Sequence, residues 1–175
     1  RQVVRHLAEQ GHERIAFVRW PTLSLAGSHR YAGYCAVMSE LGLMVDERWL
    51  IEAENTPAHG QIAAQQLMAL PPDVRPTAIA CVSDVVAIGV MRALREMGLA
   101  VGRDVAVTGF DDIPAAEHLS PPLTSVHQPL EAIGHQLMTM LLDVLQGLAV
   151  ETRQILIQPR LVVRTSSQDA IPQAG

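Results

Sequence analysis

The stretch TAIACVSDVVAIGVMRALREMG, residues 77–98, contains in one unit the two kinds of element that the rest of the chain repeats. Residues 77–82 are apolar almost throughout, which is typical of a strand buried on both faces of a sheet. Ser83 or Asp84 can cap the helix that follows, and Gly98 can end it. The wide apolar face of this helix consists of Val85, Val86, Ile88, Met91, Leu94 and Met97.

The same alternation continues on both sides of this stretch. Short apolar strands are expected at residues 14–18, 49–51 and 104–109. Helices are expected at about residues 3–10, 28–41 and 56–70, with Ser28 and Thr56 as caps. Continuous apolar strands separated by helices predict an α/β fold, in which a parallel sheet is covered by helices on both faces.

The pattern changes after Pro122. Residues 123–126 form a brief extended segment, and residues 130–145 have the best amphipathic helical pattern of the chain. Short strands are expected at 154–157 and 161–163. The polar stretch from Thr165 onward is expected to be frayed.

The composition is that of a folded protein without a basic surface. The chain has 175 residues, 49 % of them hydrophobic, which suffices for one domain or for one and a half small lobes. A formal net charge of −5 argues against direct contact with DNA or RNA. Cys35 and Cys81 are expected to be reduced, buried thiols, which points to the cytoplasm. No apolar run approaches the roughly 20 residues of a membrane-spanning helix, so no membrane contact is expected.

Polar side chains follow the first four expected strands. Ligands of open parallel sheets bind beyond the carboxyl ends of the strands, so these side chains predict a polar pocket at that edge. The residues concerned are Arg19 and Trp20, Glu54 and Asn55, Ser83 and Asp84, and Asp111 and Asp112.

Arg30 and Asp111 are the sharpest candidates for binding a ligand. A guanidinium and a carboxylate can each grip neighbouring hydroxyl groups with two hydrogen bonds. The alternatives also stand: Arg30 as a solvated helix residue, and Asp111 as a turn or cap residue. Asp84 and Asp112 are each interpreted as helix or turn caps.

The residues do not predict an enzyme, a metal site or a cofactor. Asp111 and Asp112 are adjacent, but no His, Glu or Cys spacing supports a metal there. His6 and His12 lie on different faces of their helix. The chain has neither a Gly-x-Ser-x-Gly elbow nor a phosphate loop, and a sugar-processing enzyme is therefore the least favoured reading.

Several segments, in order along the chain, form a recognisable pattern. They are HLAEQGHERIAF at 6–17, RYAGY at 30–34, PTAI at 76–79, ALREMGL at 93–99, VTGFDDI at 107–113, LSPPLTSVHQP at 119–129 and LVVRTSS at 161–167. Together they resemble the effector-binding region of lactose/galactose-repressor (LacI/GalR) transcription regulators. The resemblance covers nearly the whole chain.

This resemblance implies a two-lobed fold like that of periplasmic sugar-binding proteins of type I, with the effector in the cleft between the lobes. Most of the C-terminal lobe corresponds to residues 1–123, and a fragment of the N-terminal lobe to 129–157. Residues 124–128 are a crossover, 158–167 return to the C-terminal lobe, and 168–175 are a tail. The DNA-binding head is expected to lie outside this sequence, which begins at Arg1 without an initiator Met.

The resemblance also assigns roles to six residues at the cleft. Arg30 and Asp111 match the family residues that bind effector hydroxyls, and Gln128 matches a cleft-lining crossover position. Ser83 stands where the family commonly has Asn, and Asn55 where some sugar-responsive members have an aromatic ring. Trp20 replaces a small residue, and it is expected either to reach the cleft or to decorate an exposed loop.

The function implied is that of a cytoplasmic repressor's sensing domain. A sugar or polyol effector would control operator binding allosterically, in a homodimer that contacts DNA only through its missing head. The apolar face of residues 85–97 fits a dimer contact, or else packs on the sheet. The alternative is a periplasmic sugar-binding protein of a transport system. The helix at 130–145 is expected to need a cover for its apolar face and to cause self-association.

Overall fold

The computed structural model describes residues 1–21, 24–148 and 154–168. Its sheet has six strands in the order β2-β1-β3-β4-β5-β6. Strands β1 to β5 are parallel, and β6 pairs antiparallel with β5. Their bounds are Ile15–Arg19, Leu50–Glu52, Ala78–Cys81, Ala106–Asp111, Thr124–His127 and Arg160–Val162 for β1 to β6. The predicted α/β fold with a mainly parallel sheet is confirmed.

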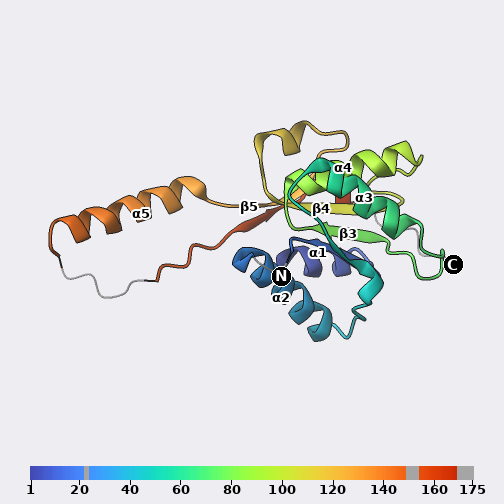
Figure 1. Ribbon diagram of the computed structural model, residues 1–175, viewed down its shortest axis with the longest axis horizontal. Helices are drawn as coiled ribbons and strands as arrows, with labels where there is room; N and C mark the ends of the chain where they lie inside the picture. The colour runs from blue at the N-terminus through green and yellow to red at the C-terminus, as the bar shows by residue number, and fades with distance from the viewer. Residues whose placement is uncertain (22–23, 149–153, 169–175) are drawn as a thin grey trace.

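Helices cover both faces of this sheet. Figure 1 shows α1 and α2 on one face and α3 and α4 on the other. The helices span Gln2–Glu9, Leu25–Glu40, Pro57–Met68, Asp84–Glu96 and Leu130–Leu145 for α1 to α5, and short 3₁₀ turns lie at Glu47–Trp49, Pro114–His118 and Thr165–Ser167. Every residue of β3 is buried, which explains why its sequence is apolar throughout rather than alternating.

Two glycines let α3 and α4 approach each other closely. A Cβ added to Gly89 of α4 would lie 1.9 Å from the Pro57 carbonyl oxygen, and one added to Gly60 of α3 would lie 2.2 Å from the Val86 carbonyl oxygen. Backbone atoms cannot yield as a flexible side chain can. The contact between the two helices therefore depends on both glycines.

Three local expectations are wrong. Helix α2 begins at Leu25 because Ser24, and not Ser28, accepts a hydrogen bond from the Gly27 amide. Residues 154–157 form no strand, and they belong to none of the six strands of the described sheet. Residues 165–167 are not frayed: the Ser166 hydroxyl donates to the Val107 carbonyl and accepts from the Thr124 amide, and both Ser166 and Ser167 are buried.

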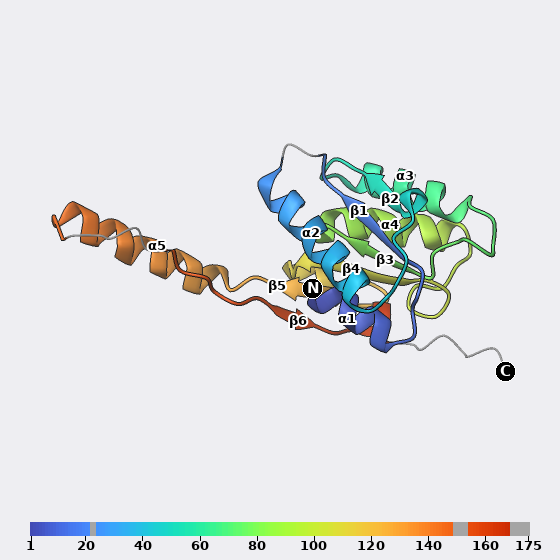
Figure 2. The same cartoon turned by 90° about the horizontal axis from the view of Figure 1, so that it is seen from below.

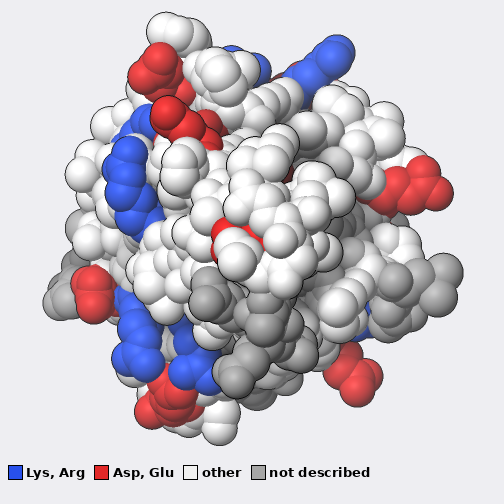
Figure 3. All heavy atoms as spheres, turned by 90° about the vertical axis from the view of Figure 1, so that its left-hand side faces the viewer, with Lys and Arg blue, Asp and Glu red and all other residues white. Residues whose placement is uncertain are grey.

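Helix α5 projects away from the rest of the molecule (Figures 1 and 2). None of its residues is buried. In Figure 3, which looks at the molecule from the α5 end, uncharged side chains fill most of the centre and charged ones lie mainly near the outline. The large apolar side chains that α5 exposes are Leu130, Leu137, Met138, Leu141, Leu142, Val144 and Leu145.

Substituting Gly89 tests the close contact between α3 and α4. Alanine is the better helix former, yet we expect Gly89→Ala to lower the free energy of unfolding by about 2–3 kcal/mol because its Cβ would overlap the Pro57 carbonyl. Gly134→Ala in α5 is the matched control, since its Cβ would meet nothing within 4 Å. Urea unfolding followed by circular dichroism compares the two, and equal effects would contradict this account of the contact.

The exposed face of α5 should make this 175-residue chain self-associate. Multi-angle light scattering at increasing protein concentration should give a mass above that of one chain. Leu137 and Leu141 are both more than half exposed, so the double change of both to Glu should restore the monomer without unfolding it. A wild-type chain that stays monomeric throughout would disprove the expectation.

Candidate functional site

Arg30 and Asp111 lie side by side at the carboxyl edge of the sheet. Arg30 extends from α2, and its Nη2 lies 3.7 Å from Oδ1 of Asp111, the last residue of β4. Nη1 of Arg30 donates to the Val82 carbonyl, just beyond the end of β3. The Arg30 side chain is 17 % exposed and that of Asp111 30 %, so both remain within reach of a ligand.

Burial and mutual attraction act in opposite directions on this pair. Burial raises the pKa of Asp111 above its usual value, while Arg30 and a hydrogen bond from Gln128 pull it back. Burial likewise lowers the pKa of Arg30, against the attraction of Asp111 and Asp84. Each group therefore stabilises the charged form of the other in a half-buried position.

Two aromatic rings hold the Arg30 guanidinium in place. Its central carbon lies 3.6 Å from the centre of the Phe110 ring and 5.0 Å from that of the Trp20 ring. Trp20 therefore reaches Arg30 instead of decorating a distant loop. Phe110 was not among the predicted site residues, although its place directly before Asp111 is a signal for it.

The remaining three predicted residues belong to the same edge. Gln128 donates from Nε2 to Oδ1 of Asp111 at 2.6 Å. Ser83 follows Val82, which Arg30 contacts, and its hydroxyl donates to Oδ1 of Asn55 at 2.6 Å. The Ser83 hydroxyl also accepts a hydrogen bond from the Val86 amide as the cap of α4. Of this pair, Asn55 therefore has the side-chain NH₂ group to offer to a ligand.

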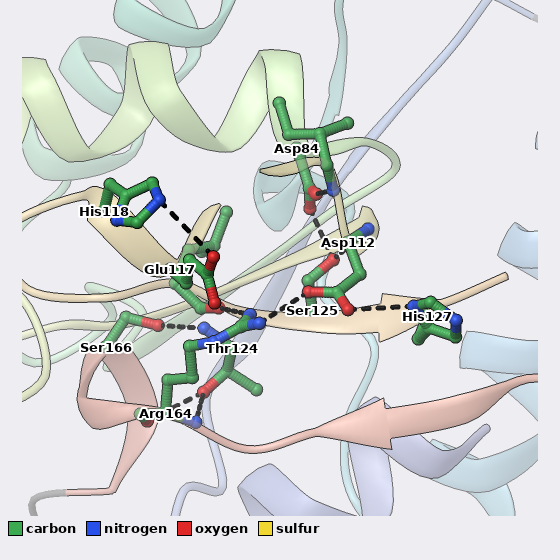
Figure 4. A network of polar contacts seen from close by, with 11 residues as sticks. Asp84, Asp112, Glu117, His118, Thr124, Ser125, His127, Arg164 and Ser166 are labelled. Atoms are coloured by element: carbon green, nitrogen blue, oxygen red, sulfur yellow. Dashed lines mark hydrogen bonds and ion pairs between the residues drawn. The ribbon is translucent and has the colours of Figure 1, made fainter. Parts of the chain in front are cut away.

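Asp112 binds the two strands that lead to and from α5 (Figure 4). Its carboxylate lies 3.0 Å from Nδ1 of His127 at the end of β5, and 2.8 Å from Nη2 of Arg164, which follows β6. Asp111 and Asp112 have φ values of 115° and 52°, a conformation that L residues rarely adopt. The expectation that Asp112 caps the following turn is wrong, because no side-chain hydrogen bond caps that turn and Asp112 contacts β5 and Arg164 instead.

Asp84 is fully buried beneath this edge. It accepts hydrogen bonds from the Ser125 hydroxyl at 2.5 Å and from the Ile113 amide at 2.9 Å (Figure 4). Its pKa is raised to about 6. Burial is the main cause, and the nearby charges of Asp111 and Asp112 contribute to the rise. The cap of α4 is Ser83, so the interpretation of Asp84 as that cap is wrong.

A cleft of about 920 Å³ opens between this edge and the first turns of α5. Polar residues from both sides line it: Asp111, Asp112, His127, Gln128, Glu131, His135 and Gln136. Within the described residues, no group of three or more His, Cys, Asp or Glu side chains is placed to hold a metal ion. A search of the same residues for a helix long and apolar enough to cross a bilayer finds none.

Comparison with known proteins identifies the family. Residues 4–167 match the periplasmic binding protein-like domain. The repressor PurR of Escherichia coli O139:H28 is 36 % identical over 165 residues, which cover 94 % of this chain and 48 % of PurR. The chain thus spans about half the length of the curated relatives it matches.

Solved structures agree with this match. A LacI-family regulatory protein from Chloroflexus aggregans has a TM-score of 0.91 at 39 % identity, covering 95 % of this chain and 59 % of that one. The CelR–cellobiose complex has a TM-score of 0.87 at 35 % identity, covering 94 % and 50 %. The lac repressor dimer bound to operator and the anti-inducer ONPF has a TM-score of 0.86 at 31 % identity, covering 94 % and 56 %.

The fold is therefore that of an α/β domain of the periplasmic-binding-protein type. The chain belongs to the periplasmic binding protein-like domain family, and its relatives in sequence and in structure are LacI-family transcription regulators.

The raised pKa of Asp84 predicts a pH-dependent stability. Below about pH 4 the carboxyl is protonated in both the folded and the unfolded chain, whereas above pH 6 the folded chain must bury its charge. Relative to Asp84→Asn, the wild type should lose on the order of 2 kcal/mol of unfolding free energy as pH rises from 4 to 7.

Urea titrations of both proteins across this pH range measure the difference. Asp104→Asn is the control with the opposite sign, because hydrogen bonds from Arg103 and the Ala100 amide lower the pKa of Asp104. A stability difference between the wild type and Asp84→Asn that does not change with pH would refute the assignment.

Proposed function

We propose that this chain is the ligand-sensing part of a bacterial transcription repressor, and that a small hydroxyl-bearing effector, a sugar or polyol, binds between Arg30 and Asp111. The observation that carries the proposal is the placement of these two side chains 3.7 Å apart at the carboxyl edge of a parallel sheet. The names of the relatives, which include the repressor PurR and a transcriptional regulator in complex with cellobiose, support it.

The pair is suited to a hydroxyl group, which both donates and accepts. The guanidinium of Arg30 supplies donors in a fixed plane, and Asp111 supplies acceptors. Oδ1 of Asp111 is used by Gln128, while its Oδ2 has no hydrogen bond to any residue of the described ranges. A hydroxyl would donate to Oδ2 and accept from Arg30, with Asn55 and Gln128 as further contacts and the Trp20 ring beside them.

The projecting α5 supports the division into lobes. Residues 1–123 and 158–167 would form the C-terminal lobe, 124–128 a crossover, 129–157 a fragment of the N-terminal lobe, and 168–175 a tail. A helix with an apolar face and no buried residue fits a partner lobe supplied by further sequence. Effector binding would favour one arrangement of the lobes and so alter operator binding by a DNA-binding head beyond this chain.

A homodimer and a cytoplasmic location complete the proposal. The lac repressor neighbour is a dimer bound to operator DNA. The dimer supports a homodimer for this protein, and binding to operator DNA supports a cytoplasmic location. Half of the apolar face at residues 85–97 is already buried within the chain, which leaves Val85, Ile88 and Met97 for a partner subunit. The relatives named above are transcription regulators, so a periplasmic binding protein of a transport system is less supported.

A thermal-shift screen against sugars and polyols tests the proposed site. A ligand that binds the folded chain raises its melting temperature, and Arg30→Ala and Asp111→Asn should each weaken the hit about tenfold or more, since each removes a charged hydrogen-bonding partner. Arg92→Ala and Asp73→Asn change exposed residues away from the edge and serve as matched controls. A hit that stabilises wild type and both site variants equally would remove these residues from the binding site.

A further inference from the structure

A second cavity, smaller than the cleft beside α5, lies on the face of the sheet that α1 and α2 cover. Its volume is about 200 Å³. Phe17 is in register with Ala80 of β3, and Phe110 with Val126 of β5, and alternate residues of a strand point to the same face. The residues of this cavity, here called the ring pocket, that the argument uses are Phe17, Tyr34, Ala80, Val82, Phe110 and Val126. The polar side chains that also line it are those of Arg1, Gln2, Arg30 and Gln158.

Arg30 separates the ring pocket from the proposed effector site. It lines the pocket and stacks on Phe110, and the same guanidinium lies 3.7 Å from Asp111. Phe110 and Val82 each precede a residue of the edge, namely Asp111 and Ser83. A molecule held at Asp111 is therefore one side chain away from the pocket.

Most of the side chains that line the ring pocket are apolar, which favours an apolar occupant. The Tyr34 hydroxyl already donates to the Ile15 carbonyl at 2.8 Å, so it offers no free donor to a polar ligand. A cavity of about 150 Å³ lined by apolar side chains is known to take up benzene, so one of this size suits one aromatic ring or a fused pair. Such a ring would also lie beside the cation of Arg30, which is attracted to aromatic faces.

We propose that the ring pocket receives an apolar, ring-sized group of the effector, while the hydroxyl-bearing part of the same molecule binds at Asp111. The inference rests on the proposed function and extends it. The effector class becomes a hydroxylated molecule with an aromatic or similarly compact apolar substituent, such as an aryl glycoside, rather than a bare sugar.

Indole tests the pocket without any sugar. Titration into the ¹⁵N-labelled chain should shift amide signals around β3 and β5, and Ala80→Leu, which fills the pocket, should weaken binding at least tenfold. Ala32→Leu makes the same change on the exposed side of α2 and should leave binding unaltered. Val126→Phe fills the pocket from the opposite strand and replaces Ala80→Leu if that variant does not fold.

Absence of indole binding to the wild type, or equal binding to the wild type and a folded pocket-filling variant, would overturn the inference. Methyl and phenyl glycosides of the same sugars form the second arm. A phenyl glycoside that binds at least tenfold more tightly than its methyl partner, with the preference lost in Ala80→Leu, supports the proposal. Equal binding of every pair contradicts it and leaves the effector site at Asp111 intact. Indole binding together with failure of every glycoside supports the pocket and counts against the hydroxyl site.

Discussion

Parallel pairing of β1 to β5 brings the carboxyl ends of all five strands to one edge, and every feature of the site depends on that constraint. Arg30, from a helix on one face, reaches over the edge to the Val82 carbonyl and Asp111. Ser83 caps a helix on the other face and holds Asn55. Side chains far apart in sequence thus come together because they follow parallel strands that end at the same edge of the sheet.

The adjacent residues Asp111 and Asp112 have different roles, one at the exposed edge and one in contact with neighbouring strands. Asp111 faces Arg30 and Gln128, where a ligand can reach it, whereas Asp112 contacts His127 and Arg164. Both residues have positive φ values, a strained conformation held by the surrounding hydrogen bonds. Ligand binding at Asp111 would therefore take place next to Asp112, the residue that contacts the strands leading to and from α5.

Two of the three carboxylates in this region have an arginine beside them, and the third does not. Asp84, Asp111 and Asp112 lie close to one another, and Arg30 and Arg164 each lie beside one of them. Asp84 has only neutral donors, Ser125 and the Ile113 amide, which is why burial raises its pKa. The edge thus combines a buried carboxyl that has no cation beside it with two carboxylates that do, of which Asp111 is the more exposed.

The sequence by itself determined the alternation of strands and helices, the parallel sheet and the family, because unbroken apolar runs and turn residues are local signals. It also placed polar residues at the strand ends. Only the tertiary structure decided that Phe110 stacks on Arg30, that Asp112 binds Arg164, and that Ser166 and Ser167 are buried against β4 and β5. Those contacts join residues up to 80 positions apart, as Arg30 and Phe110 are, and neither a polar serine nor an aspartate reveals from its neighbours in sequence which distant donor it will meet.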